Sequence, residues 1–194
     1  MAYNDCIARC SGIAEWIAFF DVDEFLVVKD APDVNSWLDR YSRFDAVAVN
    51  WRYFGDSGLT SVGDDKSMVR RFTRASAKLD DHVKTIVNLQ RPDCRMHICC
   101  HCTEKSLLAP STVAVDGMAW CIGPKAQPPN NAVNIAYLAH FRCKTFQEYL
   151  EKSRRNNTGI MRDACIKDDM FEQFNKNDIE DLSLQDIMRR ELNP

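Results

Sequence analysis

The chain has 194 residues, a length that suits one domain or slightly more than one. Its 25 Lys and Arg residues against 28 Asp and Glu residues give a net charge of -3 at pH 7, which provides no basic field for a nucleic-acid backbone. The apolar runs are far shorter than the roughly 18 residues needed to cross a bilayer, and the first residues lack the apolar core of a signal peptide. We therefore expect a globular protein that is soluble as given, with no nucleic-acid partner and no transmembrane segment in this chain.

The first predicted strand carries a group of acids. Residues 16–28 (WIAFFDVDEFLVV) form two apolar runs separated by acids, and their aromatic and β-branched residues favour a buried strand that ends in an acidic turn. Because side chains alternate along a strand, Asp21 and Asp23 are expected on the same face. Residues 33–43 place apolar side chains three and four positions apart, which predicts an amphipathic helix of about ten residues.

The rest of the chain predicts further strands and then helices. Residues 46–54 read as a strand that ends in a turn at residues 55–58. Similar patterns predict strands at 68–73, 83–89, 96–103 and 134–142, with a long loop at 116–131. Thr145 and Glu148 form a capping-box signal before a helix, and Ser183 and Asp186 repeat it before a last short helix. This order of elements predicts a mixed α/β (α+β) fold with C-terminal helices.

The acidic segment is the clearest candidate for a metal site. Two carboxylates on one spot repel each other, and a divalent cation removes that cost. Hard oxygen ligands suit Mg²⁺ or Mn²⁺, which also hold substrate phosphates. The other interpretation of Asp21 and Asp23 is that they only solvate the junction between a strand and a turn.

Four segments in this order together resemble glycosyltransferase family 92 and the similar family 2-like glycosyltransferases of GT-A fold: WIAFFDVDEFLVV, NWRYFGDSG, KTIV and LAHFRCKTFQEYLEK. The resemblance covers most of the chain, and four ordered motifs are more specific than one DxD motif. It implies a truncated GT-A-like mixed sheet flanked by helices, because the N-terminal half that binds the nucleoside in such enzymes is absent. We expect a catalytic portion at residues 1–158 and a C-terminal helical extension at residues 159–194.

The resemblance also implies the roles of the acids and of one histidine. Asp21 and Asp23 would bind the metal and the nucleotide sugar, and His140 would be the third metal ligand. The catalytic base that removes a proton from the acceptor hydroxyl is expected to be a carboxylate. The first candidate is Asp56, followed by Asp64, Asp65 and Asp116.

Two lysines and four further residues complete the expected site. Lys84 and Lys144 are candidates for the donor diphosphate, whose negative charge grows as the glycosidic bond breaks. The expected acceptor side is made of aromatic faces, a glycine that permits close approach and a histidine, namely Trp51, Phe54, Gly55 and His97.

The leading hypothesis is therefore a metal-dependent, inverting glycosyltransferase that uses Mn²⁺ or Mg²⁺. It would transfer a sugar from a nucleotide sugar, expected to be a UDP-sugar, to a hydroxyl of a glycan acceptor. One alternative is an inactive glycosyltransferase-like binding module. Another is a zinc-stabilised interaction domain, because zinc-ligand residue types cluster at Cys94, His97, Cys99, Cys100, His101 and Cys102.

The nine cysteines bear on redox state and location. They are an odd number in a chain too long to need disulfides for stability, so we expect mostly reduced thiols. Reduced thiols favour a cytoplasmic compartment, whereas the resemblance is also compatible with a parent protein that is anchored in the Golgi.

Overall fold

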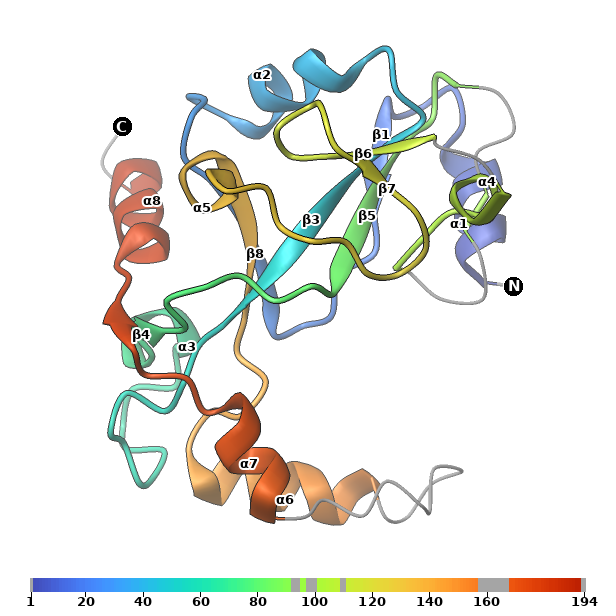
Figure 1. Ribbon diagram of the computed structural model, residues 1–194. Helices are drawn as coiled ribbons and strands as arrows, with labels where there is room; N and C mark the ends of the chain where they lie inside the picture. The colour runs from blue at the N-terminus through green and yellow to red at the C-terminus, as the bar shows by residue number, and fades with distance from the viewer. Residues whose placement is uncertain (1, 92–94, 97–100, 109–110, 157–167, 193–194) are drawn as a thin grey trace. The chain divides into compact units, whose positions relative to one another are not determined.

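The computed structural model describes residues 2–91, 95–96, 101–108, 111–156 and 168–192 (Figure 1). The chain divides into two compact units. Unit 1 consists of Met1–Trp51 and Lys78–Leu138, and unit 2 consists of Arg52–Ala77 and Ala139–Pro194. The expected boundary at residue 158 lies outside the described residues, and that division of the chain stays a prediction.

Unit 1 contains most of a mixed sheet together with short helices. Its elements are α1 (Ala2–Cys10), β1 (Trp16–Ala18), β2 (Glu24–Val28), α2 (Val34–Leu38), a 3₁₀ turn (Asp39–Tyr41), β5 (Val83–Asn88), α4 (Glu104–Leu108), β6 (Thr112–Ala114), β7 (Trp120–Cys121) and α5 (Ala132–Ile135). Two strands, β3 (Ala46–Tyr53) and β8 (Ala136–His140), begin in unit 1 and end in unit 2.

The described strands of the larger sheet number seven, and their order runs β1-β5-β3-β6-β7, with β8 paired to both β2 and β3. The β3 strand is antiparallel to β5 and parallel to β6, so the sheet is mixed. Figure 1 shows β3 and β5 side by side. All residues of β3, β5 and β8 are buried, which explains why their sequences are rich in apolar residues on both faces instead of strictly alternating. The mixed α/β fold predicted from the sequence is confirmed.

Unit 2 is mainly helical. It contains α3 (Met68–Arg71), β4 (Arg74–Ala75), α6 (Phe146–Asn156), α7 (Asp168–Phe174), β9 (Ile179–Glu180) and α8 (Ser183–Leu192). An ion pair joins β3 to the segment before α8, because Arg52 Nη1 lies 2.7 Å from Asp181 Oδ2 with both side chains buried. Phe171 of α7 packs against Tyr149 of α6 and the buried Cys143. The predicted C-terminal helices are therefore confirmed.

Several predicted elements are confirmed, some with changed bounds. The strands predicted at 46–54, 83–89 and 134–142 correspond to β3, β5 and β8. The helix predicted at 33–43 is shorter, as α2 continues only into a 3₁₀ turn; Asp33 caps it by accepting the Ser36 N–H at 2.8 Å. The predicted capping box of α6 is present, since Thr145 Oγ1 accepts the Glu148 N–H and Glu148 Oε2 accepts the Thr145 N–H.

Two strand predictions and one loop prediction are wrong. Residues 68–71 form helix α3, which Ser67 caps by accepting the Arg70 N–H, so this local hydrogen bond outweighs the weak strand pattern. Met96 and Thr103 pair with each other as an antiparallel bridge, which excludes a single strand through both. The loop predicted at 116–131 contains the short strand β7.

The acidic segment also differs from its prediction. The strand breaks between β1 and β2, and the residues of β1 are half-buried instead of buried. Asp21 and Asp23 lie in the turn between the two strands, so strand alternation does not place them on one face. The side chain of Asp21 is 66% exposed, whereas Asp23 is 5% exposed.

Candidate functional site

The acidic turn between β1 and β2 is joined to β5 by a buried lysine. Lys84 Nζ lies 3.0 Å from Asp21 Oδ2 and 3.3 Å from Glu24 Oε2. Glu24 Oε2 also accepts the backbone N–H of Asp21 at 2.8 Å. The side chains of Lys84 and Glu24 are 1% and 0% exposed, so this contact is made away from solvent. The sequence prediction that Lys84 contacts a donor diphosphate stays a prediction.

Glu24 is the most constrained acid of the turn. Burial raises the pKa of its carboxyl, although the Asp21 N–H and Lys84 oppose that shift. Its second oxygen, Oε1, is buried and has no hydrogen-bond partner among the described residues. Lys84 balances the carboxylate charge at Oε2, whereas Oε1 is left without a donor, which fits a turn that can accept a cation.

The other two expected metal ligands are buried. Asp23 lies next to Glu24 in the same turn. His140 ends β8 and is 5% exposed; its carbonyl accepts the Phe54 N–H, and its ring lies 5.5 Å from the ring of Tyr53. Asp21 and Asp23 belong to unit 1 and His140 belongs to unit 2, and their common binding of one metal stays a prediction.

Trp51 stands between two imidazole rings in unit 1. His82 stacks on the indole ring at 5.1 Å with an interplanar angle of 18°, and the His101 ring meets it edge-on at 5.4 Å. His101 Nδ1 lies 2.7 Å from the Val83 carbonyl oxygen, so Nδ1 carries the proton that donates to it. Burial lowers the pKa of His101, assisted by the nearby Lys84. The His101 imidazole is therefore neutral at neutral pH.

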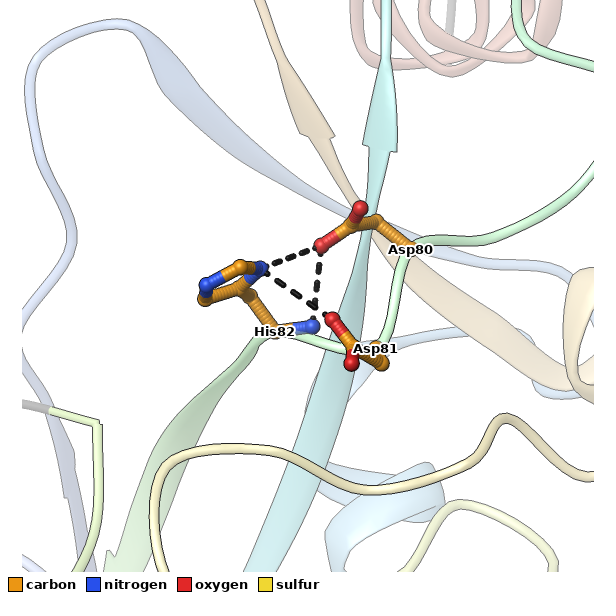
Figure 2. A group of neighbouring side chains, drawn as sticks. All are labelled: Asp80, Asp81 and His82. Atoms are coloured by element: carbon orange, nitrogen blue, oxygen red, sulfur yellow. Dashed lines mark hydrogen bonds and ion pairs between the residues drawn. The ribbon is translucent and has the colours of Figure 1, made fainter.

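A second group of acids precedes β5. The ligand atoms of Asp80, Asp81 and His82 all lie within 4.8 Å of one another, as Figure 2 shows. His82 Nδ1 is 2.6 Å from Asp80 Oδ1 and 3.3 Å from Asp81 Oδ1, and Lys125 Nζ is 3.4 Å from Asp81. Two carboxylates and an imidazole are ligands that Mn²⁺ or Zn²⁺ accepts. The same contacts also pair these groups with one another and with Lys125 without any ion.

The GDSG turn after β3 is held by the segment before β9. Both carboxylate oxygens of Asp56 accept hydrogen bonds, from Asn175 Nδ2 at 2.9 Å and from Asn177 Nδ2 at 3.1 Å. A Cβ added to Gly55 would lie 2.5 Å from the Asn177 side chain. The groups that approach the Gly55 backbone closely are Asn177 and Lys176 of the same chain. The expected approach of an acceptor sugar to Gly55 stays a prediction. The role of Asp56 as catalytic base stays a prediction.

The other acids considered as bases have structural contacts or lie on the surface. Asp65 pairs with Arg70 at 2.7 Å, and hydrogen bonds from Arg70 and the Ser67 N–H lower its pKa to about 2. Asp116 accepts the N–H groups of two turn residues, Met118 and Ala119. Asp64 is exposed.

Of the expected acceptor residues, the two aromatic ones are largely buried. Phe54 is 2% exposed and packs on Phe141 at 4.8 Å, and Trp51 is 6% exposed. His97 lies outside the described residues, as do three cysteines of the possible zinc cluster, Cys94, Cys99 and Cys100. Cys6, Cys10, Cys121 and Cys143 are free thiols, as predicted for reduced cysteines.

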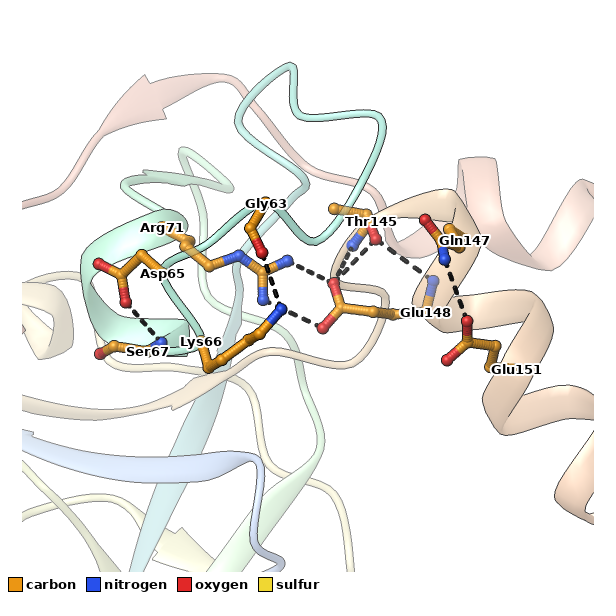
Figure 3. Close-up of polar contacts among 9 residues, drawn as sticks. All are labelled: Gly63, Asp65, Lys66, Ser67, Arg71, Thr145, Gln147, Glu148 and Glu151. Atoms are coloured by element: carbon orange, nitrogen blue, oxygen red, sulfur yellow. Dashed lines mark hydrogen bonds and ion pairs between the residues drawn. The ribbon is translucent and has the colours of Figure 1, made fainter.

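Lys144 adopts a left-handed backbone conformation directly before α6. Its φ is 59°, a strained value for a residue with a side chain. The residues that follow hold the chain in place at this position. The capping box of α6 is joined to α3 through an ion pair between Arg71 and Glu148 (Figure 3). Strained residues cluster at functional sites, which is consistent with the expected contact between Lys144 and a phosphate.

The sequence gives no indication that His82 stacks on Trp51 or that Lys84 pairs with Glu24. It indicates His101 only as a possible zinc ligand. These contacts leave no local sign, because Trp51 and Asp21 lie far along the chain from His82, Lys84 and His101. The stacking of His82 on Trp51 depends on the pairing of β3 with β5, which only the fold reveals.

These features define an α/β enzyme with an acidic turn backed by a buried lysine and an aromatic residue nearby in the sheet. The sequence model of glycosyltransferase family 92 matches residues 1–189. The chain therefore belongs to glycosyltransferase family 92, and the enzyme class implies a sugar donor and an acceptor. No curated protein matches the chain. Among the described residues, no helix combines the length and the apolar character required to cross a membrane.

Proposed function

We propose that the chain is the catalytic portion of a metal-dependent, inverting glycosyltransferase. It transfers a sugar from a nucleotide sugar, taken to be a UDP-sugar, to a hydroxyl of a glycan acceptor. The observation that supports this best is the acidic turn, where the carboxylates of Asp21 and Glu24 both contact the Lys84 ammonium and Asp23 lies between them in the sequence. The buried Glu24 Oε1, which lacks a donor, supports the fit of a cation to this turn.

Asp21 and Asp23 would hold Mn²⁺ or Mg²⁺, with His140 as a third ligand that rests on the family resemblance. When bound, such an ion supplies positive charge that stabilises the departing nucleoside diphosphate. Asp21 would bind the ion from the solvent-exposed side of the turn, and Asp23 would be a buried ligand that is shielded from water.

The remaining roles belong to residues of both units. Lys144 would neutralise the donor diphosphate from the strained position before α6. The acceptor-side role of Trp51 rests on the family resemblance, and its buried ring, in contact with His82 and His101, would support the acceptor side from within the sheet. The base would take the proton of the acceptor hydroxyl, and Asp56, whose carboxylate also accepts hydrogen bonds from Asn175 and Asn177, is the first candidate.

Calorimetric titration of Mn²⁺ into the purified chain, with and without UDP, tests this function. We expect binding that UDP strengthens, that Asp23→Asn abolishes, and that the control Asp81→Asn leaves unchanged. Release of UDP from a UDP-sugar in the presence of acceptor would then show transfer. Absence of Mn²⁺ binding by the folded wild-type chain in both conditions, or its loss only in Asp81→Asn, would contradict the proposal. Binding without any UDP release would favour the inactive binding module.

A further inference from the structure

Glu24 and Lys84 form a buried pair whose contacts both converge on Asp21. The contacts close a ring: the Asp21 N–H donates to Glu24 Oε2 at 2.8 Å, Lys84 Nζ lies 3.3 Å from the same oxygen, and Lys84 Nζ donates to Asp21 Oδ2 at 3.0 Å. The ring therefore fixes the backbone of Asp21 through Glu24 and its carboxylate through Lys84. A backbone hydrogen bond from Glu24 N–H to the Asp21 carbonyl, at 3.0 Å, closes the turn from the other side.

The exposure of the three side chains separates their roles. Asp21 is 66% exposed, whereas Lys84 and Glu24 are at most 1% exposed. A ligand that approaches from solvent can reach the Asp21 carboxylate but cannot reach the two buried side chains without disrupting the turn. Of these three side chains, Asp21 is therefore the one that can contact a cation, and the buried pair can act only through it.

The ring also joins a segment outside the strands to a rigid part of the sheet. Asp21 lies in the turn between β1 and β2, whereas Lys84 lies within β5, paired with Val49 of β3. Its neighbours Val83 and Thr85 are buried, so the backbone of Lys84 is held on both sides. A carboxylate fixed from such a strand is held in place before a ligand arrives, which reduces the entropy lost on binding.

From these contacts we infer that Glu24 and Lys84 are positioning residues that preset Asp21 for the cation. This inference rests on the proposed function for the identity of the ligand. It gives Lys84 a role within the turn in place of the expected contact with the donor diphosphate. It also gives the third acid of the segment DVDE a role distinct from that of a metal ligand.

The test needs a variant that removes the ring without leaving a buried charge. Replacing Lys84 alone would leave the buried Glu24 without its charged partner and could unfold the chain, whereas loss of the Glu24 charge leaves Lys84 paired with Asp21. The double variant E24L/K84M replaces both side chains by apolar ones of similar volume, so we expect it to fold with a melting temperature close to that of the wild-type chain. Glu24→Gln is the conservative control, because its amide oxygen can still accept the Asp21 N–H.

Two measurements decide the inference. Hydrogen exchange of the Asp21 amide, made without metal, should show protection in the wild-type chain and in Glu24→Gln, and loss of protection in E24L/K84M. The affinity for Mn²⁺ in the presence of UDP should fall about tenfold in the double variant, the size of loss typical when the support of a metal ligand is removed, and should be largely restored in Glu24→Gln.

A folded E24L/K84M variant that keeps the Asp21 amide protected, or keeps the wild-type affinity for Mn²⁺, would overturn the inference. Failure of the wild-type chain to bind Mn²⁺ would instead overturn the proposed function. The amide measurement needs no metal, so it would still decide whether Glu24 and Lys84 hold Asp21.

Discussion

Arg71 and Glu148 form a two-pronged ion pair although 77 positions separate them in the sequence. Arg71 Nη1 lies 3.1 Å from Glu148 Oε1, and Nη2 contacts Oε2 (Figure 3). Glu148 Oε2 also accepts the Thr145 N–H and hydroxyl, so a single carboxylate both caps α6 and binds α3. The Glu148 carboxylate therefore links α3 to the start of α6, and the capped Thr145 directly follows the strained Lys144.

Arg71→Met is expected to destabilise the protein by about 3 kcal/mol, because it leaves a largely buried carboxylate without its charged partner. The side chain of Arg71 is 5% exposed. The adjacent Arg70, which is 61% exposed and pairs with Asp65 at the surface, provides a matched control. We expect Arg70→Met to leave the urea midpoint of unfolding nearly unchanged. Equal losses in the two variants would show that the ion pair with Glu148 has no special weight.

The stabilisation by Glu148 should depend on pH. Burial by itself would raise the pKa of Glu148, but hydrogen bonds from Arg71 and Thr145 outweigh burial and hold the pKa below its usual value of 4.5. A lowered folded-state pKa means that the stabilisation is complete above pH 4.5 and is lost as the pH falls below it. The difference in unfolding free energy between the wild-type chain and Glu148→Gln should therefore shrink from pH 6 to pH 3. A constant difference across that range would contradict the ionic contribution.

Gly55→Ala should destabilise the turn after β3 more than a glycine replacement in open space. The new Cβ would lie 2.5 Å from both Asn177 Oδ1 and the Lys176 carbonyl oxygen, and the backbone oxygen cannot move easily. Gly63→Ala is the control, because Gly63 has a positive φ of 64° but no atom within 4 Å of the added Cβ. We expect a loss above about 2 kcal/mol for Gly55→Ala and near 1 kcal/mol for Gly63→Ala in thermal unfolding. The reverse order would show that the contact with Asn177 is easily displaced.

Features encoded within a few residues could be predicted from the sequence. The strands β3, β5 and β8 are recognisable because each is short and rich in β-branched, aromatic or other apolar residues, as expected for strands buried on both faces. The capping box of α6 is recognisable because Thr145 and Glu148 are three positions apart and bind each other. The helix α3 is misread as a strand, because its four residues carry too short a pattern to reveal a period.

The candidate site could be predicted only in part, because its contacts join distant segments. The segment DVDE identifies the acids, but the contact of Asp21 with Lys84 spans 63 positions. A lysine in a strand normally indicates a solvent-exposed face, and the burial of Lys84 follows only from its pairing with Glu24. The hydrogen bonds of Asp56 with Asn175 span 119 positions, so the sequence gives no sign that this carboxylate already holds a turn.

Two cysteines should resist alkylation in the folded protein. Burial raises the pKa of Cys121 to about 11 and that of Cys143 to about 12, so neither forms a thiolate at pH 8. Cys10, which is only half-buried in α1, should react first. Mass spectrometry after iodoacetamide treatment at pH 8 measures this, and urea-unfolded protein serves as the fully reactive control. Rapid native labelling of Cys143 would show that the packing of α7 against it opens readily.

The neutral state of His101 predicts a loss of stability in mild acid. Burial lowers the pKa of His101, with a smaller contribution from Lys84, and outweighs the hydrogen bond to the Val83 carbonyl. The unfolded chain, with a histidine pKa near 6.5, therefore binds the proton first, and folding weakens as the pH falls below that value. In His101→Gln, whose amide N–H can still donate to Val83, this proton-linked loss should disappear.

Urea unfolding of both chains at pH 7.5, 6.5 and 5.5 measures the effect, and the wild-type chain should lose stability relative to His101→Gln only in the acidic part of the series. Parallel curves would show that His101 titrates alike in the folded and unfolded states. Because the His101 ring lies edge-on to Trp51, the same protonation would place a charge beside the indole ring proposed to support the acceptor side. Acceptor affinity is therefore expected to fall over the same pH interval, and His101→Gln should remove that dependence.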